Sequence, residues 1–259
     1  MPEQFPQVQG GGSLILAWQI RNKNVLVVGG GEVAAGRILN LLNADARVTV
    51  VCPSSGLNPE VRHRIAHGQV THVDRVFLPL DLEPSKNVAM VLTAIDDPAA
   101  STRIWKYCKA QRVPANIADV PPECDFYFGS VHRDGPLQIM VSTNGNGPRL
   151  AARIRRDIAG FLPQGTGDSI ARVGQLRRKL RKRAPGIGTE DIQRRMAWMT
   201  RVCDEWEGEE LGVLGDDEMD ALVRFYDTDE VPSFEQLRLG GGKQDGVVWD
   251  WDGSYGFAI

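Results

Sequence analysis

The sequence predicts an α/β protein built on a doubly wound parallel sheet, followed by a small α+β region and a C-terminal helical domain. Two observations predict the sheet. Apolar strand-like runs alternate with helical stretches from Asn24 to about Pro114, and those runs are apolar on both faces. Strands of this kind are typical of a parallel sheet that helices cover on both sides. After Ala115 the alternation stops, which indicates a change of architecture.

The first part of the chain supplies the strands and helices of the predicted sheet. Pro53 ends the second strand, and Pro98 lies near the start of a helix, where its missing N–H needs no partner. The predicted elements are a strand at 24–28, a helix at 32–43, strands at 47–52 and 87–95, and a helix at 98–111.

The middle of the chain predicts a β-hairpin. Two strand-like runs flank Arg133–Asp134–Gly135, a sequence typical of a hairpin turn. We expect this hairpin, residues 126–142, to carry an aromatic face that needs a cover. That face consists of Phe126, Tyr127 and Phe128.

Helical patterns occupy most of the remaining chain. A helix begins near Pro148 and carries Leu150, Ile154 and Ile158 on one face. Further helical patterns lie at 168–183, 189–206 and 216–226. The end of the chain is rich in Gly and Asp, contains Trp249 and Trp251, and shows no helical period.

The composition is that of an ordinary globular protein, with 42% hydrophobic and 24% charged residues. No run of 18 or more apolar residues occurs, so no membrane-spanning helix is predicted. The first residues, MPEQFPQVQG, lack the pattern of a secretory signal. The four cysteines are scattered without a CxxC pair, which favours a reducing compartment such as the cytoplasm over a disulfide scaffold or a zinc site.

Charge is distributed unevenly along the chain. Residues 148–201 hold 14 basic and 4 acidic residues, whereas residues 202–259 hold 3 basic and 16 acidic residues. The run RRKLRKR, 177–183, is basic at every position but one. Three interpretations fit this run: a solvated helix face, a surface that steers an anionic substrate, or a nucleic-acid contact. No aromatic residue interleaves with the basic ones, which disfavours nucleic acid.

A glycine turn joins the first predicted strand to the first predicted helix. Gly29, Gly31 and Ala34 form the pattern GxGxxA within NVLVVGGGEVAAGR. In Rossmann-type folds the first glycine permits a tight turn, and the second lets a pyrophosphate approach the backbone. The small third residue lets the helix pack closely on the strand, and the helix N-terminus presents N–H groups to the anion. The turn therefore predicts a dinucleotide site, with a ligand-free glycine turn as the alternative.

The acidic residue that usually accompanies an NAD-binding turn is missing. It would bind the ribose hydroxyls from the end of the second strand. Here that position reads VVCPSS, and neither Cys52, Pro53 nor Ser54 carries a charge. Ribose recognition would then fall to backbone groups and to the hydroxyl of Ser54 or Ser55. Because no arginine lies there either, the sequence indicates no dedicated site for the 2′-phosphate of NADP.

Four segments together resemble the sirohaem-synthase family, in particular its fungal-type bifunctional precorrin-2 dehydrogenase/sirohydrochlorin ferrochelatases. They occur in order and at compatible spacing between about residues 14 and 162, and the resemblance fades through the C-terminal third. Members of this family often lack the acid after the second strand, so the resemblance implies NAD as cofactor without the usual carboxylate. The segments are VLVVGGGEVAAGRILNLL, LTAIDDPAASTRI, ANIADVPPECDFYF and VSTNGNGPRLAARIRRDI.

The resemblance also implies roles for single residues. Asp119 matches the family's catalytic aspartate, and its place before Val120–Pro121–Pro122 predicts a stiff, extended segment at the ligand-binding edge of the sheet. The alternative is an aspartate that initiates a turn. The implied cofactor-binding residues are Gly29, Gly31, Glu32, Val33, Pro53, Ser54, Thr93, Ala94 and Ile95. The implied tetrapyrrole-binding residues are Thr143, which stands where bacterial members carry a serine, and Asn144, Arg149 and Arg153.

These features predict NAD-dependent oxidation of precorrin-2 to sirohydrochlorin, followed by insertion of ferrous iron as a second substrate to give sirohaem. By resemblance, the chain divides into an NAD-binding Rossmann domain at 1–114, a dimerisation region of a homodimer at 115–160, and a helical domain with an acidic tail at 161–259. No nucleic-acid or membrane partner is expected. The four histidines show no metal-ligand spacing, so no resident metal is predicted.

Two alternatives remain open. The first is a monofunctional precorrin-2 dehydrogenase without chelatase activity. The second is a nucleotide-sensing or nucleic-acid-binding regulator that combines a Rossmann domain with a basic helical arm.

Overall fold

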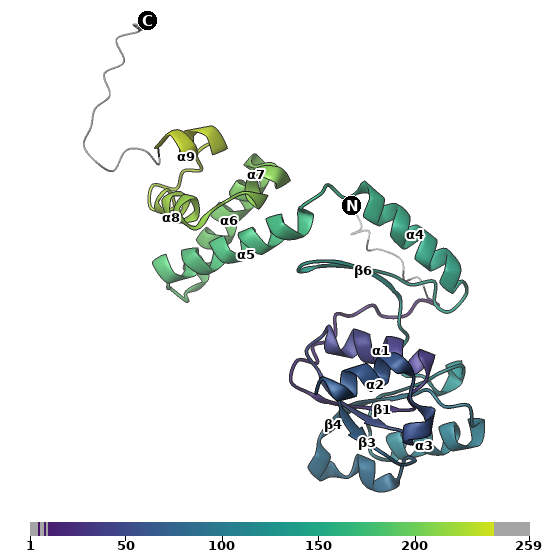
Figure 1. Cartoon of the computed structure of the whole chain (residues 1–259). Coiled ribbons are helices and arrows are strands. Elements are labelled where there is room, and N and C mark those ends of the chain that lie inside the picture. Colours follow the sequence, from purple (N-terminus) through teal and green to yellow (C-terminus); the bar gives the residue numbers. More distant parts are fainter. Residues whose placement is uncertain (1–4, 6–7, 9, 241–259) are drawn as a thin grey trace, which may run out of the picture. The chain divides into compact units, whose positions relative to one another are not determined.

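The computed structural model describes residues 5, 8 and 10–240 of the 259-residue chain, so the Trp-containing end at 241–259 lies outside the described residues. The chain forms two compact units (Figure 1). The first consists of Met1–Phe128 with Asn144–Asn146, and the second of Gly129–Thr143 with Gly147–Ile259. The region 115–160, assigned above to dimerisation, is divided between these two units.

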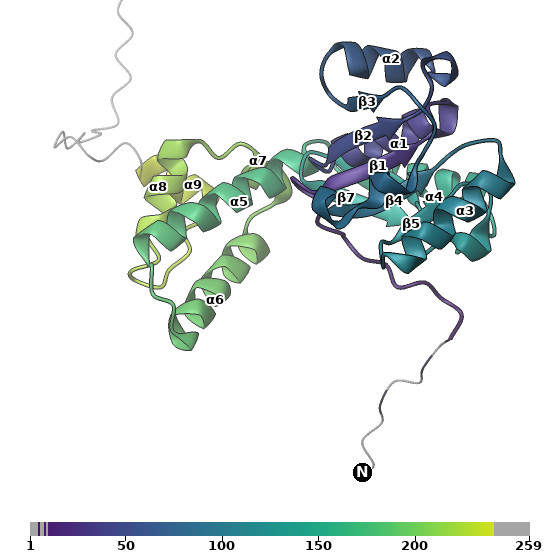
Figure 2. The same cartoon turned by 90° about the horizontal axis from the view of Figure 1, so that it is seen from below.

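The first unit contains the predicted parallel sheet. Its five strands lie in the order β3-β2-β1-β4-β5, which can be followed in Figure 2, and every neighbouring pair is parallel. The α/β class is therefore confirmed. The strands are β1 (Asn24–Val28), β2 (Arg47–Val51), β3 (Thr71–Val73), β4 (Val88–Thr93) and β5 (Ala115–Ile117).

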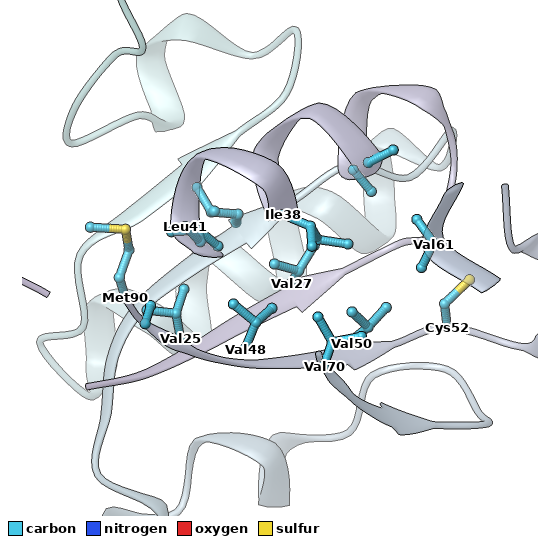
Figure 3. Packing of buried hydrophobic residues seen from close by; sticks show 14 of the residues in the cluster. Val25, Val27, Ile38, Leu41, Val48, Val50, Cys52, Val61, Val70 and Met90 are labelled. Atoms are coloured by element: carbon cyan, nitrogen blue, oxygen red, sulfur yellow. The ribbon is translucent and has the colours of Figure 1, made fainter. Parts of the chain in front are cut away.

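Helices cover both faces of this sheet because its strands are apolar on both sides. Val25 and Val27 of β1 pack with Ile38 and Leu41 of helix α1 (Glu32–Leu42), as Figure 3 shows. Leu26 and Val28 of β1 point to the other face of the sheet and belong to a second core, which helix α3 (Pro98–Ala110) covers. Full burial of such a side chain contributes about 1.5–3 kcal/mol, so the two cores fix the sheet between its helices.

Several short elements of the first unit were not predicted. Helix α2 (Pro59–Ala66) starts after Asn58, whose side chain accepts a hydrogen bond from the Glu60 amide at 2.7 Å. Strand β3 has three residues and pairs at the sheet edge with β2. The 3-10 turns are η1 (Ser54–Gly56), η2 (Pro79–Leu82), η3 (Pro84–Lys86) and η4 (Pro121–Glu123).

The second unit begins with the predicted hairpin. Strands β6 (Ser130–Asp134) and β7 (Leu137–Val141) are antiparallel, and helix α4 (Pro148–Phe161) packs on both. The predicted aromatic face is wrong, because the three aromatic residues precede β6. Phe126 and Phe128 instead pack against the core of the first unit, and the Phe126 ring lies 5.6 Å from that of Trp18.

Helices α5 to α9 of the second unit pack around their own core. The three helical patterns predicted there are confirmed, and the short α7 and α9 were not predicted. Two buried tryptophans direct their indole N–H groups to backbone carbonyls, Trp198 to Glu230 at 2.8 Å and Trp206 to Pro232 at 2.9 Å. The helices are α5 (Thr166–Arg183), α6 (Thr189–Glu205), α7 (Gly208–Gly212), α8 (Asp216–Arg224) and α9 (Phe234–Gly240).

A search of the described residues for a helix with the length and apolarity needed to cross a bilayer finds none.

Candidate active site

The candidate site lies at the carboxyl edge of the five-stranded sheet, where the loops after four strands meet. Three backbone hydrogen bonds join these loops: Gly29 N–H donates to Val51 at 3.0 Å, Ala94 N–H to Val28 at 2.8 Å, and Ala118 N–H to Thr93 at 2.9 Å. Ligands of open α/β sheets bind outside this edge. Asp119 and most of the predicted cofactor residues belong to these loops or to the strand ends beside them, and Glu32 and Val33 belong to the first turn of α1.

The glycine turn after β1 has one position that excludes a side chain and one that leaves room for a ligand. Gly29 has a φ of +112°, and a Cβ there would lie 2.0 Å from the Ala94 carbonyl oxygen. Gly31 caps α1 with a φ of −77°, and a Cβ there would meet no atom within 4 Å. Open space above a helix N-terminus is what a dinucleotide pyrophosphate requires. The turn therefore fits the predicted cofactor.

The first turn of α1 and the end of β4 flank this space. Glu32 and Val33 are exposed, and the Glu32 carboxylate accepts a hydrogen bond from the Asn58 side chain at 3.4 Å. Thr93, the last residue of β4, is buried, and its hydroxyl has no hydrogen-bond partner within the described part of the chain. Buried hydroxyls normally have a partner. An unpartnered hydroxyl at this strand end is a second feature that fits a bound ligand.

The loop after β2 binds a carboxylate that the sequence patterns did not reveal. Pro53 and Ser54 are exposed at the start of η1, and Ser54 binds Asp74 twice. Its N–H donates to Oδ1 of Asp74 at 2.7 Å, and its hydroxyl donates to Oδ2 at 2.5 Å. These hydrogen bonds hold the pKa of Asp74 below its ordinary value. The sequence did not indicate Asp74 because this residue follows β3, a strand too short to show a sequence pattern.

Asp119 lies two residues beyond β5 at the same edge, and its side chain is exposed. The predicted extended segment is wrong, because Asp119 has a φ of +62° and Val120 N–H bonds back to Ile117 at 3.3 Å. Aspartate is among the non-glycine residues that tolerate this left-handed conformation. The carboxylate therefore belongs to an exposed residue in a tight turn that follows β5.

Arg37 of α1 is a further charged group near Asp119 that was not predicted. Its guanidinium lies 4.0 Å from the ring centre of Phe128 and is half-buried. Burial lowers the pKa of Arg37, and interactions with the ionisable groups of Cys124 and Asp119 partly offset that effect. Arg37 therefore lies close enough to Asp119 for the two charges to interact.

The residues that the resemblance assigns to the tetrapyrrole follow the hairpin. The Thr143 hydroxyl accepts a hydrogen bond from the Gly147 amide at 3.1 Å, one residue before α4 begins. Asn144 belongs to the first unit, where its side-chain amide donates to the Gly11 carbonyl at 2.9 Å. Arg149 and Arg153 are exposed on α4 in the second unit.

Metal-ligating residue types are dispersed in the structure. No group of three His, Cys, Asp or Glu side chains suited to a metal ion occurs within residues 5, 8 and 10–240. His63 and His67 are exposed at α2, with ring centres 4.0 Å apart. Iron is a substrate of the predicted reaction. The residues that its insertion requires are therefore those that accept the pyrrole protons of the tetrapyrrole.

Family models match the chain in three consecutive stretches. Residues 16–130 match a putative NAD(P)-binding model, residues 134–160 a sirohaem biosynthesis protein central model, and residues 163–232 a sirohaem biosynthesis protein C-terminal model. A protein named as a siroheme biosynthesis protein from Schizosaccharomyces pombe is 49% identical over 250 residues, which cover 96% of this chain and 93% of that protein. The chain belongs to the sirohaem biosynthesis family.

Other relatives of this chain differ in length. The siroheme biosynthesis protein of Saccharomyces cerevisiae is 31% identical, with 74% of this chain and 82% of that protein covered. A protein named "Siroheme synthase" from Methylobacillus flagellatus is also 31% identical, but the chain spans 38% of its length. The predicted end of the resemblance near residue 162 is corrected by the C-terminal model, which matches 163–232.

The fold of this chain is also similar to a solved structure. A structure titled "SirC, precorrin-2 dehydrogenase" superposes with a TM-score of 0.57 at 20% identity, and the match covers 88% of this chain and 100% of that one. At this identity the likeness concerns the fold. It includes the parallel sheet, the small antiparallel sheet and the helical region.

Proposed function

We propose that this chain oxidises precorrin-2 to sirohydrochlorin with NAD and then inserts ferrous iron to give sirohaem. The observation that supports the proposal most directly is the arrangement of residues at the carboxyl edge of the sheet. There, the open space at Gly31 and the exposed carboxylate of Asp119 belong to loops joined through the ends of β1, β4 and β5. Membership of the sirohaem biosynthesis family supports the choice of pathway.

The cofactor would be held by the glycine turn and the loops beside it. The N–H groups at the start of α1 would bind the pyrophosphate, and the loop at Pro53 and Ser54 would face the adenine ribose. Thr93, Ala94 and Ile95 would border the nicotinamide. When bound, NAD accepts the hydride that leaves the substrate. Glu32 and Val33, exposed in the first turn of α1, would border the pyrophosphate.

Asp119 is proposed as the catalytic base of both reactions. Dehydrogenation releases one proton besides the hydride, and iron insertion releases two pyrrole N–H protons. An exposed carboxylate at the ligand-binding edge can accept such protons, and water can then carry them away.

The tetrapyrrole is proposed to contact residues around the start of α4. Precorrin-2 carries eight carboxylates, which suit exposed guanidinium groups such as those of Arg149 and Arg153. The hydroxyl of Thr143 and the amide of Asn144 would add hydrogen bonds. Substitution of either arginine by Met is expected to raise the KM for precorrin-2 and to leave NAD binding unchanged.

One coupled assay tests the proposed function. Full-length protein is incubated with precorrin-2 and NAD while NADH is followed, and ferrous iron is then added while the sirohaem absorbance band is followed. NADH formation followed by sirohaem formation is expected. NADH without enzymatic acceleration of iron insertion would indicate the monofunctional alternative. Failure to form NADH, together with salt-dependent retention of DNA, would overturn the proposal in favour of the regulator.

We further propose that the protein is a homodimer. Four large apolar side chains on the hairpin and α4 are 37–89% exposed: Val131, Leu150, Ile154 and Phe161. Exposed apolar groups of this size favour association. Sedimentation at nanomolar concentration is expected to give a dimer, and Leu150→Arg a monomer. Val213→Arg, at an exposed site in the helical region, is the matched control and should leave the dimer intact.

A cytoplasmic location is proposed because the cysteines form no disulfide within the described residues. All four, Cys52, Cys108, Cys124 and Cys203, are free thiols. Free thiols suit a reducing compartment. Fractionation of cells that express the tagged chain should recover it in the cytosol, and recovery in a secretory or organelle fraction would contradict the proposal.

A further inference from the structure

We propose that Asp74 makes the adenine-ribose end of the cofactor site select NAD over NADP. The inference rests on the proposed function, because it concerns the same dinucleotide site. Neither the glycine turn nor the residues after β2 carry a charge that could distinguish the two cofactors, and Asp74 supplies one from the neighbouring strand.

The sheet register places Asp74 beside the loop that follows β2. Val51, the last residue of β2, pairs with Val73, the last residue of β3, and Cys52 N–H donates to the Val73 carbonyl at 3.2 Å. Asp74 and Ser54 therefore leave the sheet at the same edge. Asp74 is exposed, so its carboxylate faces solvent at the position where an adenine ribose would lie.

Asp74 occupies the donors that a 2′-phosphate would need. A phosphate on the ribose is held by hydroxyls, backbone N–H groups and arginines. In this loop the Ser54 N–H and the Ser54 hydroxyl both donate to Asp74, at 2.7 and 2.5 Å. A 2′-phosphate would have to displace the Asp74 carboxylate from these donors. It would then remain close to the negative charge of Asp74, which would repel it.

The nearest arginine in the sequence is engaged elsewhere. Arg75 directs both terminal guanidinium nitrogens at Asp81, with Nη1 2.8 Å from Oδ2 and Nη2 2.7 Å from Oδ1. Asp81 is buried, and Lys86 also contacts it at 3.3 Å. Because this bidentate pair is fixed to a buried carboxylate, Arg75 is not available to neutralise a phosphate.

The unphosphorylated ribose makes the opposite demand. Its 2′- and 3′-hydroxyls are donors that seek an acceptor, and each oxygen of a carboxylate can accept more than one hydrogen bond. Asp74 can hold Ser54 and still accept from a ribose hydroxyl. It thus performs, from the end of β3, the role that the acid after β2 performs in other NAD-binding folds.

Nucleotide binding to the full-length chain tests the inference without the tetrapyrrole. Calorimetric titrations of NAD and NADP are compared for the wild type, Asp74→Ala and Asp74→Asn. The wild type should prefer NAD. Asp74→Ala, which removes the charge and frees both Ser54 donors, should bind NADP about tenfold tighter or more and NAD more weakly. Asp74→Asn, which removes the charge but keeps an acceptor, should give a smaller gain for NADP.

The control is Asp45→Asn, which removes one charge at the opposite edge of the sheet, where Asp45 pairs with Arg21 at 3.0 Å. It should leave the NAD-to-NADP ratio unchanged. A folded Asp74→Ala chain that keeps the wild-type ratio would overturn the inference alone. Equal weakening of both cofactors would also overturn it, since Asp74 would then serve the adenine or the loop. A wild-type chain that binds neither nucleotide would overturn the proposed function as well.

Discussion

Charged side chains have different roles at the carboxyl edge of the sheet and in the helical region. In the helical region, charges of opposite sign pair across helices and loops. Lys179 contacts Asp216 at 3.2 Å and Asp220 at 2.7 Å, and Arg201 contacts Asp229 at 2.6 Å. At the sheet edge, glycines and backbone groups shape the site, and its acidic residues Glu32, Asp74 and Asp119 are exposed.

Ion pairs in the helical region account for part of the opposite charges of residues 148–201 and 202–259. Within the basic run 177–183, Lys179 and Arg183 pair with acids of the block that follows. Arg177 and Arg181 remain exposed, so the solvated-face and substrate-steering interpretations both stay open for them. Part of this dense run of charge pairs within the helical region, whereas the candidate site lies where charge is sparse.

The largest expected effect is at Asp119. Asp119→Asn keeps the shape of the side chain and tolerates the left-handed φ, so it removes the carboxylate and little else. Loss of a general base slows a reaction by about 10²- to 10⁴-fold. We expect that loss in NADH formation, with NAD affinity unchanged by calorimetry. A decrease of less than tenfold would show that Asp119 is a turn residue and that the base lies elsewhere.

Gly31→Asp should abolish cofactor binding without unfolding the protein. The new side chain has room, because no atom lies within 4 Å of its Cβ, but its charge would face the pyrophosphate. Two like charges this close weaken binding by about 10²-fold or more. Calorimetry would measure the loss and circular dichroism the fold. Unchanged NAD affinity in the folded variant would move the dinucleotide site away from this turn.

Gly29→Ala should instead destabilise the fold. Its Cβ would lie 2.0 Å from the Ala94 carbonyl oxygen, and its φ of +112° is unfavourable for alanine. Backbone strain of this kind costs about 1–3 kcal/mol, and the steric overlap adds to it. Urea denaturation should show the decrease in the free energy of unfolding. Gly31→Ala is the matched control, and equal stability of the two variants would contradict the close packing of Gly29.

The smallest effect is expected in the helical region. Lys179 is three-quarters buried, but Asp216 and Asp220 are exposed, so the pairs are weakened by solvent. Lys179→Met should lower the free energy of unfolding by about 0.2–1 kcal/mol, and the difference from the wild type should shrink at high salt. A salt-independent loss of several kcal/mol would show that the Lys179 side chain matters through packing.

Sequence patterns predicted the long elements of the fold well and the local geometry of the site poorly. Strand β1 has the predicted bounds, and α1 ends one residue before the prediction, because continuous apolar and helical periods mark such elements. Strand β3 has three residues, too few to show a period, and Asp74 was missed with it. The extended segment at Asp119 was wrong because the aspartate adopts a left-handed φ in a tight turn, which is the alternative that the sequence left open.

Tertiary packing decided the other differences. The aromatic residues at 126–128 adjoin the hairpin in sequence, and pattern alone favoured placing them on it. Phe126 and Phe128 were instead drawn into the core of the first unit, where Trp18 and Arg37 lie against their rings. The contacts of Thr143 and Asn144 likewise join residues far apart in the chain or across a turn, which no local period encodes.

The glycine turn is held in place before any ligand arrives. The Gly29 backbone lies against Ala94, the Gly30 carbonyl accepts the Asn58 N–H at 2.7 Å, and a Cβ at Gly30 would lie 2.7 Å from the Leu57 side chain. Flexible loops lose entropy when a ligand orders them, and that loss weakens binding. A turn already rigid in the free protein avoids this loss, so cofactor association should proceed at a rate set by diffusion and orientation, without a slow closing step.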